Sequence, residues 1–147
     1  MATSNAATTY LEHAVLDFLF KNNSETFASP GDSIYIGLAT AVSDAEAGTL
    51  TEVNTSTQDA NYARQQVTAA NWTVTSVATD AQTAKNSAAI EYAASSGIAS
   101  YTVTHVFVAD ASTSGNILFV GALDASKTIA SGDIFRINTN NLTIELK

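Results

Sequence analysis

The sequence predicts a mostly-β protein, an antiparallel β-sandwich of jelly-roll-like type that carries one short N-terminal α-helix. Apolar segments with strand-type alternation recur every 8–12 residues or so between turn residues, a spacing typical of antiparallel sandwiches and barrels. Only one segment has a helical period. Because 147 residues hold a single core, we expect an N-terminal arm and helix over residues 1–23 and one β-sandwich domain over residues 24–147.

The helical segment begins at Thr9, which forms a capping-box pattern with Glu12. Four apolar residues then follow at helical spacing: Leu11, Val15, Phe18 and Leu19. The run Lys21-Asn22-Asn23 supplies a stop signal. A helix of about three turns is marginal alone. We therefore expect the four apolar residues to dock on the chain's own sheet or on a neighbouring subunit, and we take them as candidate interaction residues.

The middle of the chain contains strand and turn signals. A turn at residues 29–32 leads into an alternating strand over residues 33–40, and residues 42–59, which are acidic, small and Thr-rich, predict a long loop. Further strands are predicted over residues 62–69, 72–77 and 88–93.

The C-terminal third gives the clearest strand pattern. Residues 103–109 predict a strand, residues 110–115 a loop, and residues 116–123 the returning strand of a hairpin. Residues 134–137 follow a second turn, and residues 142–147 alternate between apolar and polar side chains.

Charge and composition exclude several classes of protein. The formal net charge is −8, and the few cations are scattered, so a nucleic-acid phosphate backbone would be repelled. The chain has no cysteine and hence no disulfide or thiolate metal site. No signal peptide and no apolar run of transmembrane length is visible, so we expect synthesis in the cytoplasm and no membrane partner.

The residues that could carry chemistry do not form a convincing site, and no catalytic motif is present. His105 and Asp110 point to opposite faces of a strand, which favours a structural histidine. His13 and Asp17 have helical i, i+4 spacing and form an ordinary surface pair rather than a metal site. Three acidic residues near Gly48 could hold Ca²⁺, but a solvated loop is the favoured interpretation: Asp44, Glu46 and Glu52. We expect no enzyme activity, no cofactor and no bound metal.

The aromatic residues and the two arginines remain as candidate contacts. Six aromatic residues could form a sugar-stacking surface but are more often core or inter-strand filler: Trp72, Tyr10, Tyr35, Tyr62, Tyr92 and Tyr101. Arg64 and Arg136 lie in predicted strands, where each can anchor a structural ion pair or a subunit contact.

Several segments, in one order along most of the chain, resemble a family of small virion structural proteins of tailed phages. The segments are Tyr10–Asp17, Ile34–Thr40, Gly48–Val53, Tyr62–Gln65, Thr104–Val106, Asp110–Ser112, Gly115–Phe119, Gly121–Leu123, Lys127–Ile129, Gly132–Asp133 and Leu142–Ile144. Members of that family are labelled tail-fibre proteins, and similar small β-proteins serve as capsid cement proteins. The resemblance implies a virion component and supplies no catalytic residue.

Combining these observations, we expect a capsid cement (decoration) protein that binds the major capsid protein on the outer capsid surface. A small β body, an N-terminal arm and a Thr/Ser/Ala-rich surface suit a homotrimer that locks coat subunits together. The alternative is a tail-fibre or baseplate component that takes part in host attachment through its loops.

Overall fold

The computed structural model describes residues 5–21, 34–77 and 81–146. One α-helix is present in this part of the chain, α1 (Thr9–Lys21), and a short 3₁₀ turn spans Ala69–Asn71. The strands are β1 (Ala6–Ala7), β2 (Tyr35–Asp44), β3 (Thr49–Glu52), β4 (Gln65–Gln66), β5 (Trp72–Val77), β6 (Ala81–Asn86), β7 (Ile90–Glu91), β8 (Tyr101–Ala109), β9 (Ile117–Ile129), β10 (Arg136–Ile137) and β11 (Thr143–Leu146). The predicted class, mostly antiparallel β with one short N-terminal helix, is confirmed.

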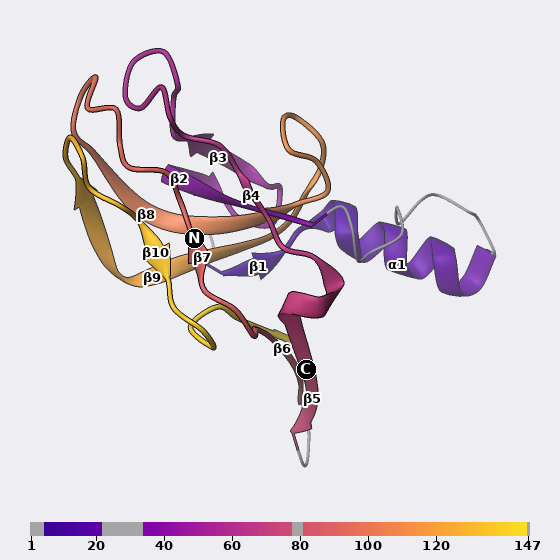
Figure 1. Ribbon diagram of the computed structural model, residues 1–147. Coiled ribbons are helices and arrows are strands. Elements are labelled where there is room, and N and C mark those ends of the chain that lie inside the picture. Colours follow the sequence, from indigo (N-terminus) through magenta and orange to yellow (C-terminus); the bar gives the residue numbers. More distant parts are fainter. Residues whose placement is uncertain (1–4, 22–33, 78–80, 147) are drawn as a thin grey trace.

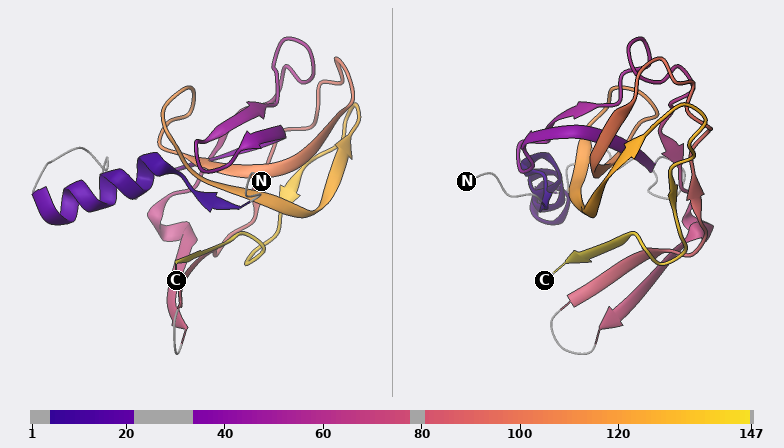
Figure 2. Two further views of the ribbon diagram at one scale, coloured as in Figure 1. Left: turned by 180° about the vertical axis from the view of Figure 1, so that it is seen from behind. Right: turned by 90° about the vertical axis from the view of Figure 1, so that its left-hand side faces the viewer.

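The strands form one large sheet and two small ones. The large sheet has the order β1-β9-β8-β2-β3, with β4 also paired to β2, while β11-β6-β5 and β10-β7 form the small sheets. All of these pairs are antiparallel. Figures 1 and 2 show the large sheet curled over the core, the β5–β6–β11 sheet extending below it in a sandwich-like arrangement, and α1 projecting from one side.

Most of the predicted strands are confirmed, with changes in length. β5 matches its predicted bounds, and β8 and β9 form the predicted hairpin, although β9 runs on to Ile129. The strands predicted over 62–69 and 88–93 shrink to the two-residue strands β4 and β7. The predicted turn at 29–32, the stop residues Asn22 and Asn23, and the boundary between arm and body lie outside the described residues.

The long loop predicted over residues 42–59 is wrong in its first part. β2 continues to Asp44, and β3 returns antiparallel to it as a hairpin. The turn places Gly48 at a φ of +67°, a left-handed conformation that glycine adopts without strain. The prediction failed because Ala, Ser and Thr fill the end of β2, and such small residues give no apolar alternation to detect.

The start of α1 also differs from the prediction, because the capping residue is Thr8 rather than Thr9. The Thr8 hydroxyl accepts a hydrogen bond from the amide of Leu11 (3.4 Å) and donates one to the carbonyl of Ile117 (2.6 Å). The Thr8 amide donates to the carbonyl of Leu118 (2.9 Å). Thr9 instead donates from its amide to the carbonyl of Glu46 (2.8 Å). The helix start is thus tied to β9 and to the β2–β3 turn.

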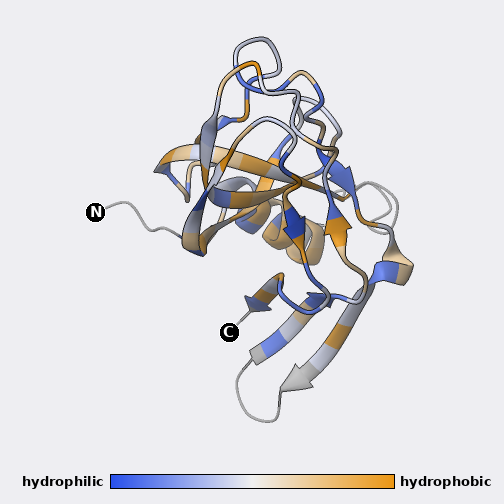
Figure 3. Cartoon of the chain, turned by 60° about the vertical axis from the view of Figure 1, so that its left-hand side comes forward, coloured by the Kyte–Doolittle hydropathy of each residue, from blue (hydrophilic) through white to orange (hydrophobic). Residues whose placement is uncertain are grey.

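The central strands of the large sheet are buried on both faces, which explains their near-continuous apolar sequence. Ile36 and Leu38 project into the larger apolar cluster, and Phe107 into the smaller one on the opposite face. All three are at most 1% exposed. Figure 3 shows hydrophobic residues following the curled sheet.

Asn86 fixes the small β5–β6–β11 sheet to the turn that precedes β11. Its side chain is fully buried, yet every polar atom has a partner. The amide nitrogen donates to the carbonyls of Ala88 (2.8 Å) and Asn138 (2.9 Å), and the amide oxygen accepts from the amide of Leu142 (2.9 Å). One side chain therefore binds three backbone groups and ties the end of β6 to the turn before β11, as a satisfied buried amide can.

Gly37 provides a test of the packing between β2 and β8. A Cβ at Gly37 would lie 2.1 Å from the ring carbon Cζ of Phe107. We expect Gly37→Ala to lower the free energy of unfolding by about 1–3 kcal/mol, because the buried ring has no room to move. Gly121→Ala is the matched control, since a Cβ there meets nothing within 4 Å. Chemical denaturation of both variants would measure the difference, and equal stability would contradict this account.

Candidate interaction surfaces

Helix α1 exposes most of its apolar side chains. Of its apolar side chains, Leu11 packs into the larger apolar cluster at 9% exposure, and Ala14 is 8% exposed. The remaining large apolar residues of the helix are exposed: Tyr10 43%, Val15 38%, Leu16 57%, Phe18 59%, Leu19 64% and Phe20 80%. Of the four apolar residues predicted to dock, Leu11 packs on the chain's own core. The other three, Val15, Phe18 and Leu19, are exposed. Sequence spacing alone could not separate these two groups.

An open groove lies between the large sheet and the C-terminal strands. Its volume is about 1220 Å³. One wall consists of β8 and β9, including Val106, Phe119 and Leu123, and the other of the segment around β10 and β11, including Ile134 and Ile144. Ile134 is 54% exposed, and Phe119, Leu123 and Ile144 are only partly buried. Sequence patterns did not predict this groove, because its walls belong to different sheets that meet only in the folded chain.

Arg64 forms an ion pair inside the chain. Its side chain is 6% exposed and binds Glu52 through two nitrogens, at 2.8 Å for Nε–Oε1 and 2.8 Å for Nη2–Oε2. The third nitrogen donates to the carbonyls of Ala111 (2.9 Å) and Ser114 (2.7 Å), and the guanidinium lies 5.0 Å from the ring centroid of Phe107. The hydrogen bond to Glu52 outweighs burial, and the pKa of Arg64 is raised. Its geometry is that of an internal anchor.

Tyr62 extends this cluster to β2. Its hydroxyl donates to Glu52 Oε1 (2.7 Å) and accepts from the amide of Leu38 (2.9 Å). The Tyr62 ring stacks on Tyr92 at 6.1 Å, and Tyr92 donates to the carbonyl of Ile36 (2.8 Å). These tyrosines serve as core and inter-strand filler, whereas Tyr10 is exposed on α1.

Arg136 pairs with Glu91 across β10 and β7 at 3.3 Å, with both side chains about half exposed at 54% and 53%. Exposed pairs of this kind contribute little to stability.

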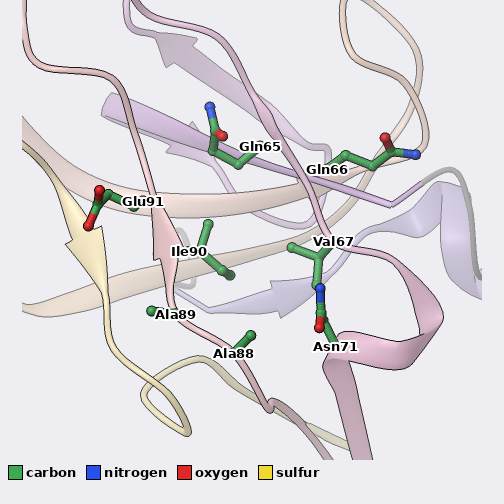
Figure 4. Close-up of a pocket in the computed structure, with 8 residues that line it drawn as sticks. All are labelled: Gln65, Gln66, Val67, Asn71, Ala88, Ala89, Ile90 and Glu91. Atoms are coloured by element: carbon green, nitrogen blue, oxygen red, sulfur yellow. The ribbon is translucent and has the colours of Figure 1, made fainter.

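A second, smaller hollow of about 270 Å³ lies beside β7 and β4. Its only ionisable lining residue is Glu91, and Figure 4 shows that Glu91 and Gln66 extend away from each other on its two sides.

The other titratable candidates do not come together. His105 shares a hydrogen bond with the neighbouring Thr104 hydroxyl (2.8 Å), and burial lowers its pKa. His13 lies 3.8 Å from Asp17 on α1. Of the three carboxylates near Gly48, Glu52 is engaged by Arg64, and Asp44 accepts from the amide of Ala47 (3.0 Å). Within residues 5–21, 34–77 and 81–146, no group of three His, Cys, Asp or Glu side chains is placed to hold a metal ion.

Comparison with known proteins identifies the family. A family model described as "Podophage GP4 fiber I protein gp80" matches residues 6–145. The chain belongs to this family. It is therefore a structural component of a bacteriophage virion, in agreement with the predicted resemblance. No curated protein matches the chain. In the described part of this fibre-family chain, no helix is both long and apolar enough to cross a membrane.

The two arginine pairs offer a matched comparison of stability. We expect Arg64→Met to lower the free energy of unfolding by about 2–4 kcal/mol, because Glu52 and the carbonyls of Ala111 and Ser114 each lose a partner. We expect Arg136→Met to cost less than about 1 kcal/mol, since water screens that pair. Thermal or urea unfolding would measure both. If the two variants were equally stable, the anchoring role of Arg64 would be wrong.

The hydrogen bonds of the Asp59 carboxylate predict that the protein is less stable in acid. The carboxylate is 2% exposed and accepts hydrogen bonds from the amides of Asn61 (3.0 Å) and Ser96 (2.9 Å) and from the Tyr101 hydroxyl (3.0 Å). Burial opposes the charged form, but the hydrogen bonds together outweigh it, and the pKa of Asp59 falls below its ordinary value of 3.8.

Because the folded state holds Asp59 ionised, its stabilisation is complete above the unfolded pKa and decreases as the pH falls from about 5 through the folded pKa. Asp59→Asn should be less stable at pH 7 by about 1–3 kcal/mol and should show a smaller loss between pH 5 and 3. Urea unfolding of both proteins across that pH range measures the difference. Parallel pH curves would exclude this role.

Proposed function

We propose that this chain is a subunit of a tail fibre of a podophage virion, and that it attaches through α1 to neighbouring subunits. The observation that carries the proposal is the family match over residues 6–145, because the family's description names a fibre protein. The body supplies a folded β scaffold, and α1 supplies an apolar surface that a free monomer leaves in water.

The geometry of the body supports a binding role. Arg64 and Asp59 both lie in hydrogen-bond networks inside the chain. Each of them is bonded to backbone groups of segments distant in sequence. Such networks rigidify a scaffold. A rigid scaffold with one projecting apolar helix is suited to assembly with other protein surfaces.

The second candidate is a capsid cement protein bound to the major capsid protein on the outside of the head. One observation favours it: the 147-residue sequence contains no internal repeat of the kind that builds a fibre stalk. A projecting helix would serve equally well to bridge two coat subunits. The two candidates differ in the site and the number of copies in the particle.

We expect antibody-labelled particles to carry the protein at the tail end, with copies on the order of a dozen to a few dozen, because the tail offers few symmetry-related positions. Electron microscopy of gold-labelled virions and quantitative mass spectrometry of purified particles measure the location and the number. Labelling spread over the head, with on the order of hundreds of copies, would replace the fibre proposal with the cement role.

A further inference from the structure

The apolar surface of α1 is large enough to be one half of a protein interface. Six large apolar side chains of the helix are between 38% and 80% exposed. Together they leave roughly 700 Å² of surface in water, taking about 200 Å² for a whole side chain of this size. That is more than a scattered set of surface residues on a monomer, and it is most of the roughly 800 Å² that each partner contributes to a stable interface.

The exposed residues lie almost all round the helix rather than on one stripe. At 100° per residue, Leu16 and Phe20 lie on the opposite side from Phe18. A helix that is apolar on most sides is normally enclosed by protein. The partner of α1 should therefore wrap around it, as a groove does, rather than meet it along a single line.

The groove between β9 and β11 has the size and chemistry to enclose such a helix. Two helical turns, about 11 Å long and 10–12 Å across, occupy roughly 850–1200 Å³. The groove volume is about 1220 Å³. Its walls present Phe119, Leu123, Ile134 and Ile144, which are partly or largely exposed to water in the isolated chain. Figure 2 shows the large sheet above this space and β11 below it.

The helix of the same chain is held out of the groove. Thr8 is bonded to the carbonyls of Ile117 and Leu118, and Thr9 to the carbonyl of Glu46. These hydrogen bonds fix the direction in which α1 leaves the sheet, and turning it back into its own groove would break them. The helix that fits must therefore come from another copy.

We propose that the second half of α1 of one copy binds in the β9–β11 groove of a second copy. The contact is heterologous, because the helix of one subunit meets the groove of the next, and each subunit within an assembly uses both surfaces. This mode of self-association is independent of whether the virion carries the protein on its tail or its head.

Two variants of the full chain separate the two surfaces. Leu19→Lys with Phe20→Lys makes the helix surface charged while keeping good helix-forming residues at the end that favours cations. Gly121→Leu projects a side chain into the groove, and the isolated subunit accepts a Cβ there because nothing lies within 4 Å. Val74→Lys changes an apolar residue that is 71% exposed on β5, away from both surfaces, and is the matched control.

Sedimentation velocity over a range of concentrations measures the result, and circular dichroism verifies that each variant is folded. We expect the unmodified chain and Val74→Lys to form oligomers, and the helix and groove variants to dissociate with a Kd raised by about thirtyfold or more. A mixture of the helix variant and the groove variant should form a 1:1 heterodimer, because the intact helix of one fits the intact groove of the other.

The mixing experiment distinguishes this contact from other modes of association. If helices bundled with each other, Gly121→Leu would remain oligomeric and mixing would restore nothing, which would overturn the proposal. A monomeric unmodified chain at about 100 μM, far above the Kd of a stable interface, would overturn it as well.

Discussion

The ion pair between Arg64 and Glu52 is the interaction that holds β3, the segment before β4 and the loop after β8 together. Arg64 precedes β4, Glu52 ends β3, and the carbonyls that Arg64 also binds belong to the loop after β8. Their separation in sequence is at least 12 residues, so each contact closes a loop and costs chain entropy. Bidentate geometry and the nearby Phe107 ring offset that cost by satisfying a buried charge on several sides. The curled sheet keeps its shape because these segments cannot separate independently.

Sequence patterns predicted the elements whose side chains alternate strongly and missed those built from small residues. The β8–β9 hairpin and β5 have bulky β-branched or aromatic residues in a two-residue period, and both were found. The end of β2 is Ala, Val, Ser and Asp, where pairing with β3 rather than composition decides the structure. The helix cap was misplaced by one residue because Thr8 and Thr9 are both competent caps. Only the fold shows that the Thr8 hydroxyl accepts from the amide of Leu11 while it donates to the Ile117 carbonyl of β9.

The candidate residues were partly predictable for a similar reason. Helical spacing identified four of the apolar residues of α1, and strand position indicated that each arginine makes either a structural ion pair or a subunit contact. Neither pattern could show that Leu11 enters the core while Leu19 remains 64% exposed, because that depends on where the body ends beneath the helix. The groove between β9 and β11 could not be predicted from sequence patterns for the same reason. Its walls come from β9 and β11, which belong to different sheets and meet only in the folded chain.

The outer edge of β9 has a consequence for how subunits persist before they are built into a particle. β1 covers only Phe119 and Val120 of this 13-residue strand, and the Asn5 side chain accepts a hydrogen bond from the amide of Ala122 (2.6 Å). Beyond that point, among the strands of the described residues, no other pairs with this edge. Asp124 and Lys127 place opposite charges along it. Charged edge strands resist strand-by-strand growth into amyloid-like fibrils. A concentrated pool of newly made copies in an infected cell can thus remain available for ordered assembly.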